Sequence, residues 1–149
     1  MVEIEVCGFK LNIEEIGRGK PHQTEIAGKI ATVYKHKIKV TNIKTNGYIY
    51  FTYHGSVNDY MNGKDKLTDY DLVTAFRDWL ESCNYGTMSF GDFTKELGYT
   101  DCGKAYNVWS LCRRGLKRIG KIGVTHDDLT ELINALIEYE EEVEDEKAK

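Results

Sequence analysis

The sequence contains little proline and no long run of apolar residues. Only one proline occurs among its 149 residues, and no apolar stretch approaches the roughly 20 residues that a transmembrane helix needs. The first ten residues, MVEIEVCGFK, lack the basic segment and the apolar stretch of a secretory signal. We therefore expect a cytoplasmic protein that does not enter a membrane and whose four cysteines are thiols.

Catalytic and metal-binding motifs are also missing. The four histidines are scattered along the chain, and neither HExxH nor CxxC occurs. His54-Gly55-Ser56 lacks the second glycine and the following helix of a nucleophile elbow. Gly17-Arg18-Gly19-Lys20 lacks the Ser or Thr that follows the lysine of a Walker A loop. The sequence thus predicts a protein that is not an enzyme and that needs no metal ion or cofactor.

The composition is typical of a folded chain. Hydrophobic residues make up 41% of the sequence and charged residues 30%, which is too apolar for a disordered protein. The length is close to the usual size of one domain. We expect a single domain over residues 1–149, in which residues 1–56 are mainly β, residues 68–139 are helical and residues 140–149 form an acidic tail.

The first half of the chain shows the alternation of β-strands. Val2, Ile4 and Val6 alternate with other residues, which predicts a half-buried strand over residues 2–13 that Gly8 bulges or turns. Residues 14–21 contain two glycines and the only proline, so we predict a loop there.

A β-hairpin is predicted farther along. Residues 34–43 alternate again and carry a row of lysines on one face, which we expect to be exposed to solvent. Asn46-Gly47 is typical of a two-residue type I′ turn, because both residues tolerate positive φ. The turn leads into a strand over residues 48–53. The lysines of the row are Lys35, Lys37 and Lys39.

The second half has helical periodicity. Thr68 and Asp71 have the spacing of a capping box, and apolar residues then recur at helical spacing as far as Cys83. A shorter helix is predicted to begin after Ser89 and to end at Gly98. We expect the shorter helix to contribute Phe90, Phe93 and Leu97 to the same core.

Two longer helices complete the predicted fold. One covers about residues 101–119, with Cys112 on its apolar line as a small core residue, and the other begins at Thr125. The fold class is therefore α+β. We predict an N-terminal antiparallel sheet of three or four strands that packs on a C-terminal group of about four helices.

Acidic residues are concentrated near the C-terminus. The segment EYEEEVEDE, residues 138–146, holds seven of the 24 acids and no base. Because carboxylates at a helix C-terminus oppose the helix dipole, we expect this segment to fray into a mobile tail. It either improves solubility or imitates a phosphate backbone and binds a basic channel of a partner. The candidate partner-binding acids are Glu140, Glu141, Glu142, Glu144, Asp145 and Glu146.

Basic residues form a second candidate site. They cluster on one side of the helix predicted over residues 101–119, where they could neutralise several phosphates of a nucleic acid. The alternative is a solvated face or a contact with the acidic helix. Tyrosines on the predicted hairpin could add an aromatic contact surface. The basic residues are Arg113, Arg114, Lys117, Arg118 and Lys121, and the tyrosines are Tyr48, Tyr50, Tyr53 and, beyond the hairpin, Tyr60.

The middle of the chain resembles small proteins of unassigned biochemistry that phages and other mobile elements encode. The matching stretches are Tyr70-Asp71-Leu72-Val73, Ser89-Phe90-Gly91-Asp92-Phe93, residues 96–101 and Lys104-Ala105-Tyr106 with Cys112. Proteins of this kind, which place a short antiparallel sheet before a helical half, include inhibitors of host defence such as anti-CRISPR proteins. The resemblance implies a binding protein and carries over no catalytic residue.

Two functions follow from these observations. The first is a noncatalytic mobile-element protein that binds a host protein complex, one that handles nucleic acid, and inhibits it through a charged surface. The second is a regulator that binds DNA or RNA directly through the basic helix. The two hypotheses depend on different residues, since the first relies on the acidic tail and the second on the basic helix.

Overall fold

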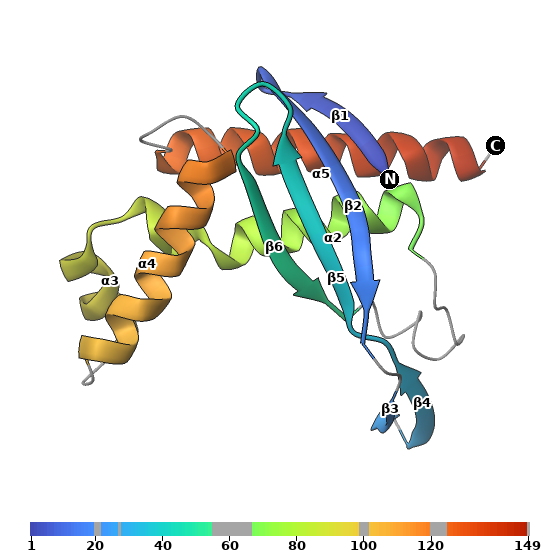
Figure 1. Cartoon of the computed structure of the whole chain (residues 1–149), viewed down its shortest axis with the longest axis horizontal. Helices are drawn as coiled ribbons and strands as arrows, with labels where there is room; N and C mark the ends of the chain where they lie inside the picture. The colour runs from blue at the N-terminus through green and yellow to red at the C-terminus, as the bar shows by residue number, and fades with distance from the viewer. Residues whose placement is uncertain (20–21, 27, 55–66, 99–101, 120–124, 149) are drawn as a thin grey trace.

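Helices cover one face of a four-stranded antiparallel sheet in the computed structural model (Figure 1). The structure describes the chain except residues 20–21, 27, 55–66, 99–101, 120–124 and 149. Among the described residues, no helix is both long and apolar enough to cross a membrane. The strands of the sheet lie in the order β1 (Val2–Val6), β2 (Phe9–Arg18), β5 (His36–Asn42) and β6 (Tyr48–Tyr53). The predicted α+β class is therefore confirmed, with the sheet in the N-terminal half.

The remaining elements are a small hairpin and the helical half. Strands β3 (His22–Ile26) and β4 (Lys29–Val33) pair with each other and project beyond one end of the main sheet (Figure 1). The sequence had left this segment unassigned. The helical half consists of α2 (Asp69–Ser82), the short 3₁₀ helix η1 (Asn84–Thr87), α3 (Phe90–Leu97), α4 (Cys102–Ile119) and α5 (His126–Ala148).

The start of the chain forms a hairpin: of the bulge or turn predicted at Gly8 within residues 2–13, the structure has the turn. Cys7 and Gly8 adopt φ angles of 51° and 79°, so that they turn the chain and Val6 pairs with Phe9. The loop prediction for residues 14–21 is wrong over residues 14–18, because β2 continues along β5. A shift of register between Glu15 and Gly17 accommodates the extra residue as a bulge.

The hairpin of β5 and β6 is confirmed, but its turn is wider than predicted. Asn42 N–H donates to the Gly47 carbonyl at 2.8 Å, and only Asn46 of the predicted turn pair has a positive φ, of 61°. The buried side chain of Asn42 explains the wider loop, because its Oδ1 accepts from the backbone N–H groups of Lys44 and Thr45. Its Nδ2 donates at 2.7 Å to the carbonyl of Ile119, which ties the hairpin to the end of α4.

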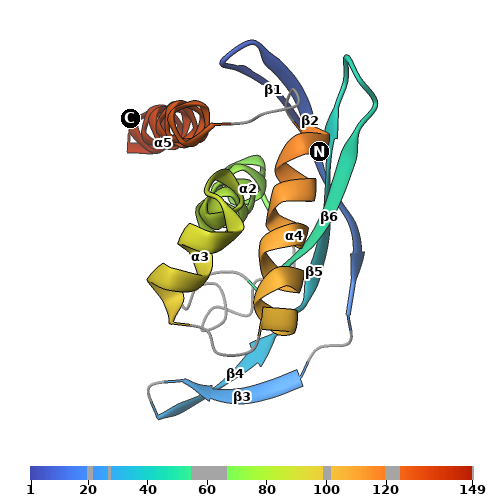
Figure 2. The same ribbon diagram turned by 90° about the vertical axis from the view of Figure 1, so that its left-hand side faces the viewer.

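The core lies between the inner face of the sheet and helices α2 and α5. Figure 2 shows the sheet from its edge, with the helices on one side of it. Within the described part of the chain, the other face of the sheet is open to solvent. The fully buried side chains of this core include Leu11, Ile13, Ile38 and Val40 from the sheet, Leu72, Val73, Phe76 and Leu80 from α2, and Leu129 and Leu136 from α5.

The helix caps predicted from the sequence are confirmed. The Thr68 side chain accepts from Asp71 N–H, and the Asp71 carboxylate accepts from Thr68 N–H at 2.8 Å, which confirms the capping box of α2. Ser89 caps α3, and Gly98 ends it with a φ of 65°. Thr125 and Asp128 make the same reciprocal pair at the start of α5. Each of these caps involves only four neighbouring residues, so the sequence alone specifies it.

Helix α3 does not pack where it was predicted to pack. Phe93 is fully buried, but against the Tyr85 ring of η1, with a centroid distance of 5.4 Å, and outside the main core. Phe90 contacts the rings of Tyr106 and Trp109 on α4. The far end of α4 and α3 therefore form an arm with its own small aromatic cluster (Figure 1). The side chain of Leu97 lies outside the described part of the structure.

Candidate nucleic-acid interface

The open face of the sheet carries lysines and tyrosines in adjacent strands. Because successive side chains of a strand point to opposite faces, burial of Ile38, Val40 and Ile49 directs their neighbours outward. In the register of β5 and β6, Lys39 is opposite Tyr50. Tyr48 and Tyr50 are 43% and 49% exposed, which makes them available to a ligand.

The tyrosine rings and the lysine ammonium groups lie against one another. The Nζ atom of Lys39 is 4.8 Å from the ring centroid of Tyr48 and 5.8 Å from that of Tyr50. The Nζ atom of Lys37 is 5.4 Å from the Tyr50 centroid. The two rings meet edge to face, with centroids 5.2 Å apart. Cation–π attraction holds these side chains in place, and so the face presents aromatic surface beside positive charge.

Helix α4 runs close to the free edge of β6 because three glycines remove side chains from the places where it meets its neighbours. A Cβ atom on Gly47, in the β5–β6 loop, would collide with the carbonyl oxygen of Arg118. On Gly86 of η1 it would lie 2.7 Å from the backbone nitrogen of Arg113. On Gly115 of α4 it would lie 2.7 Å from the indole ring of Trp79. These close approaches hold α4 against the β5–β6 loop, against η1 and against α2.

The close approach brings basic residues of α4 to the tyrosines. Arg114 and Arg118 are exposed and line one depression of about 320 Å³ together with Tyr50. Arg118 also lines a smaller depression of about 210 Å³ with Tyr48 and the β5–β6 loop. Two predicted basic residues and two predicted tyrosines therefore belong to one surface.

The other predicted basic residues lie elsewhere. The Arg113 guanidinium is 5.2 Å from the ring centroid of Trp109, on the side of the α3–α4 arm. Lys117 is exposed on α4. Lys121 lies outside the described residues, as does the predicted contact tyrosine Tyr60.

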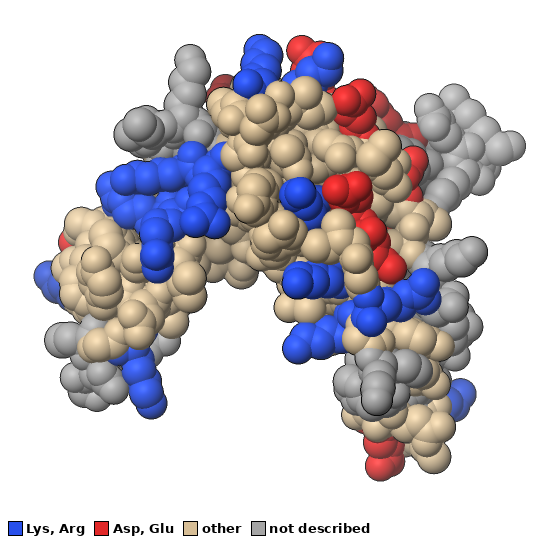
Figure 3. Space-filling model, viewed as in Figure 1, with Lys and Arg blue, Asp and Glu red and all other residues tan. Residues whose placement is uncertain are grey.

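A further basic group lies at the opposite end of the sheet. A depression of about 550 Å³ is lined by Arg18, Lys35, Lys37 and Tyr50, with backbone and smaller side chains completing it. Figure 3 shows Lys and Arg side chains gathered over α4 and, separately, over this lower end of the sheet. The loop predicted for residues 14–21 did not place Arg18 beside these lysines, whereas the structure places it at the end of β2.

An ion-paired cluster positions Arg18 at this end of the sheet. The buried ring of His36 donates from Nδ1 to Glu15 Oε2 at 2.7 Å. The other oxygen of Glu15 is 3.3 Å from Arg18 Nε. The three side chains come from the paired strands β2 and β5 and lock the bulged end of β2 to its neighbour.

The acidic segment is helical, so the prediction of a frayed tail is wrong. Helix α5 continues to Ala148. The start of the acidic segment is held because Glu140, only 7% exposed, accepts from Arg77 Nε at 2.7 Å. This hydrogen bond raises the pKa of the Arg77 guanidinium above its already high ordinary value. Arg77 also donates to Glu81 of its own helix at 3.0 Å, so one guanidinium binds a carboxylate of α2 and a carboxylate of α5.

The candidate acids are therefore not equivalent. Glu140 is committed to an ion pair within the protein, whereas Glu141 and Glu142 are exposed on α5. Glu144, Asp145 and Glu146 belong to the helix, and their side chains lie outside the described part of the structure. Among the candidate acids whose side chains are described, Glu141 and Glu142 are available to a partner and Glu140 is not.

Replacing Glu140 with alanine should destabilise the fold by about 1.5–3 kcal/mol, because a charge-assisted hydrogen bond of a half-buried arginine is removed. The matched change Glu141→Ala removes an exposed carboxylate one residue later and should alter the free energy of unfolding by no more than about 0.5 kcal/mol. Urea denaturation measures the free energy of unfolding of both variants. Equal effects of the two substitutions would contradict the assignment of Glu140 to a structural role.

A second group of acids lies where sequence analysis did not place one. Burial raises the pKa of the exposed thiol of Cys7, as do the negative charges of Glu131, Asp128 and Glu138, in that order. These acids of α5 therefore lie near the β1–β2 turn. The molecule has a basic, aromatic surface on the open sheet face and α4, and an acidic surface on α5.

Comparison with known proteins gives no match to a family model, to a curated protein or to a solved structure. Among the described residues, no group of three or more His, Cys, Asp or Glu side chains is placed to hold a metal ion.

Proposed function

We propose that this protein binds single-stranded nucleic acid on the open face of its sheet. The observation that carries the proposal is the exposed pair Tyr48 and Tyr50, which has lysines against its rings and arginines of α4 at its border. Proteins that bind single strands combine a positively charged track for the backbone with aromatic rings on which bases stack. Both components occur on this surface.

The arrangement favours a single strand over a duplex. Bases stack on an aromatic ring only when their faces are accessible, and the faces are covered in a double helix. The basic depression beside Arg18 and Lys35 lies at one end of the tyrosine pair, and Arg118 lies at the other. A strand that crosses the face would therefore meet cations before and after its stacked bases.

The test is a titration of labelled single-stranded DNA, single-stranded RNA and duplex by fluorescence anisotropy at several salt concentrations. The variant Lys39→Glu with Arg118→Glu should weaken single-strand binding about tenfold or more. It should also reduce the slope of log K against log salt by about 0.7 for each phosphate that the variant no longer neutralises.

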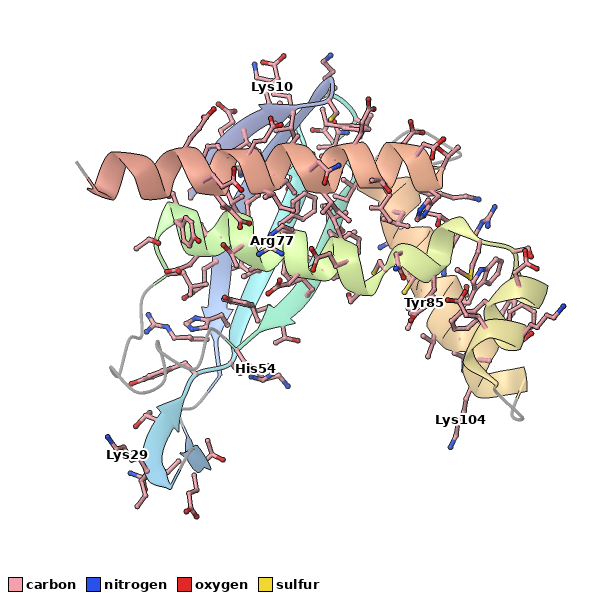
Figure 4. The ribbon with its side chains drawn as sticks, turned by 180° about the vertical axis from the view of Figure 1, so that it is seen from behind. Lys10, Lys29, His54, Arg77, Tyr85 and Lys104 are labelled. Carbon is pink, nitrogen blue, oxygen red and sulfur yellow. The ribbon has the colours of Figure 1, made fainter. Side chains whose placement is uncertain are left out.

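The matched control is Lys29→Glu with Lys104→Glu, which changes the net charge equally. Figure 4 shows Lys29 on the β3–β4 hairpin and Lys104 at the far end of α4. In the described part of the chain, neither lysine lines a depression that contains Tyr48 or Tyr50. This control should bind nearly as well as the unaltered protein. If the two variants weaken binding equally, nonspecific charge attraction explains the binding and the proposed site is wrong. Preferential binding of duplex would also contradict the proposed site.

A second function is supported by the acidic helix. We infer that the exposed acids of α5, among them Glu138, Glu141 and Glu142, can occupy a basic channel of a host protein complex that handles nucleic acid. A helix holds these carboxylates in a regular row, which a frayed tail would not. Together with the resemblance to phage and mobile-element proteins, this supports an inhibitor that acts in the host cytoplasm.

Affinity capture from host lysate distinguishes the two functions. If the inhibitor hypothesis is correct, a defined protein complex should remain bound after nuclease treatment and should be absent from the capture by the variant Glu141→Lys with Glu142→Lys. If only nucleic acid is captured and nuclease removes it, the open sheet face is the functional surface. The variant Lys39→Glu with Arg118→Glu should then capture no nucleic acid.

A further inference from the structure

Two cysteines from different helices lie together under the basic surface. Cys83 follows the last turn of α2, and Cys112 lies in the middle of α4. Their exposed fractions are only 6% and 9%, yet both line the depression of about 320 Å³ beside Tyr50. The sulfur of Cys112 is 3.9 Å from the carbonyl oxygen of Ser82, the residue immediately before Cys83. The sequence had placed both cysteines in the core only as small apolar residues.

The two thiols differ in acidity because they interact with each other. A hydrogen bond from Cys83 lowers the pKa of Cys112 to about 7. The same hydrogen bond, followed by burial, raises the pKa of Cys83 far above its ordinary value. Cys112 is therefore more readily ionised than an ordinary cysteine to the thiolate, the form that attacks disulfides. Cys83 remains a thiol beside it.

The entrance to this pair is positively charged. Arg114 and Arg118 line the same depression as the two cysteines. Cations at the entrance attract an anionic reagent. We propose that Cys83 and Cys112 form a dithiol site that reacts with anionic low-molecular-weight disulfides of the glutathione type and closes into an intramolecular disulfide.

The exchange proceeds in two balanced steps. The Cys112 thiolate attacks one sulfur of the small disulfide, so that a mixed disulfide forms and one small thiolate leaves. The Cys83 thiol then gives its proton to solvent and attacks the Cys112 sulfur, which releases the second small thiolate. Both small thiolates take up protons according to pH. The protein dithiol is oxidised by two electrons, and the small disulfide is reduced to two thiols.

Cys7 provides a comparison within the same chain. Its thiol is exposed at the β1–β2 turn, but partial burial and nearby carboxylates raise its pKa. The same carboxylates repel an anionic disulfide. The structure therefore assigns the faster reaction to the buried pair and the slower one to the exposed thiol, which is the reverse of what exposure alone would predict.

The experiment treats the folded full-length protein with oxidised glutathione, alkylates the remaining thiols and maps peptides by mass spectrometry. The variant Cys7→Ser with Cys102→Ser, which keeps only the proposed pair, should lose two hydrogen atoms in mass and show a peptide linked through Cys83 and Cys112. Adding Cys83→Ser to this variant should stop the reaction at a glutathione adduct on Cys112. Adding Cys112→Ser instead should slow adduct formation about tenfold or more.

Each outcome decides the proposal without reference to nucleic-acid binding. Linked Cys83 and Cys112 in the unaltered protein support it even if a serine variant fails to fold, which circular dichroism would show. Two alkylated thiols at these positions after prolonged exposure to oxidised glutathione would overturn it. A faster adduct on Cys7 than on Cys112 would overturn it as well.

Discussion

Replacing Tyr48 and Tyr50 together with alanine should weaken single-strand binding about 30-fold or more. Stacking of a base on an aromatic side chain contributes about 1–3 kcal/mol, and this variant removes two such rings. The rings are half-exposed on the open sheet face, so their removal takes away binding surface and leaves the core of the protein intact. Fluorescence anisotropy with a labelled oligonucleotide measures the effect directly.

The control keeps the rings and removes only their hydroxyl groups. Tyr48→Phe with Tyr50→Phe should bind nearly as well as the unaltered protein, because base stacking and the cation–π attraction to Lys37 and Lys39 depend on the ring. If the phenylalanine variant binds as weakly as the alanine variant, the hydroxyl groups and not stacked rings are responsible. Unchanged binding by the alanine variant would remove the basis of the proposed interface.

Replacing Phe76 with alanine should lower the free energy of unfolding by about 3–5 kcal/mol. The side chain is fully buried between the sheet and α2, and its ring stacks on Trp79 with centroids 6.1 Å apart. Alanine leaves a cavity that the surrounding residues fill only in part. Since small domains are stable by only about 5–15 kcal/mol, this single change should leave the fold marginal.

Leu111 supplies the comparison for Phe76. It is also a large apolar residue on a helix, but 65% of it is exposed. Leu111→Ala should therefore change the free energy of unfolding by no more than about 0.5 kcal/mol. Chemical denaturation followed by tryptophan fluorescence measures both variants. A destabilisation at Leu111 as large as that at Phe76 would mean that the core is not where the structure places it.

The sequence by itself determined the local structure well where the signal lay within a few residues. The alternation of apolar and polar residues predicted strand β5 with its row of lysines. Asn46-Gly47 predicted the hairpin that β5 forms with β6. Capping side chains predicted where α2, α3 and α5 begin. The sequence left a bulge or a turn open at Gly8. The buried positions change from even numbers, Val2 and Ile4, to odd numbers, Leu11 and Ile13, and this shift of phase is what a two-residue turn at Cys7 and Gly8 produces.

The candidate site was predicted only in parts. Tyr48, Tyr50, Arg114 and Arg118 were each singled out, but the tyrosines and the arginines are far apart in the chain, and no local pattern joins them. The tertiary structure joins them because Gly47 lets α4 approach the β5–β6 loop closely. In the same way, Glu140 is a structural residue because it accepts a hydrogen bond from Arg77, which is distant in the sequence. Composition and spacing determine which side chains can interact, whereas packing of distant segments decides which of them do.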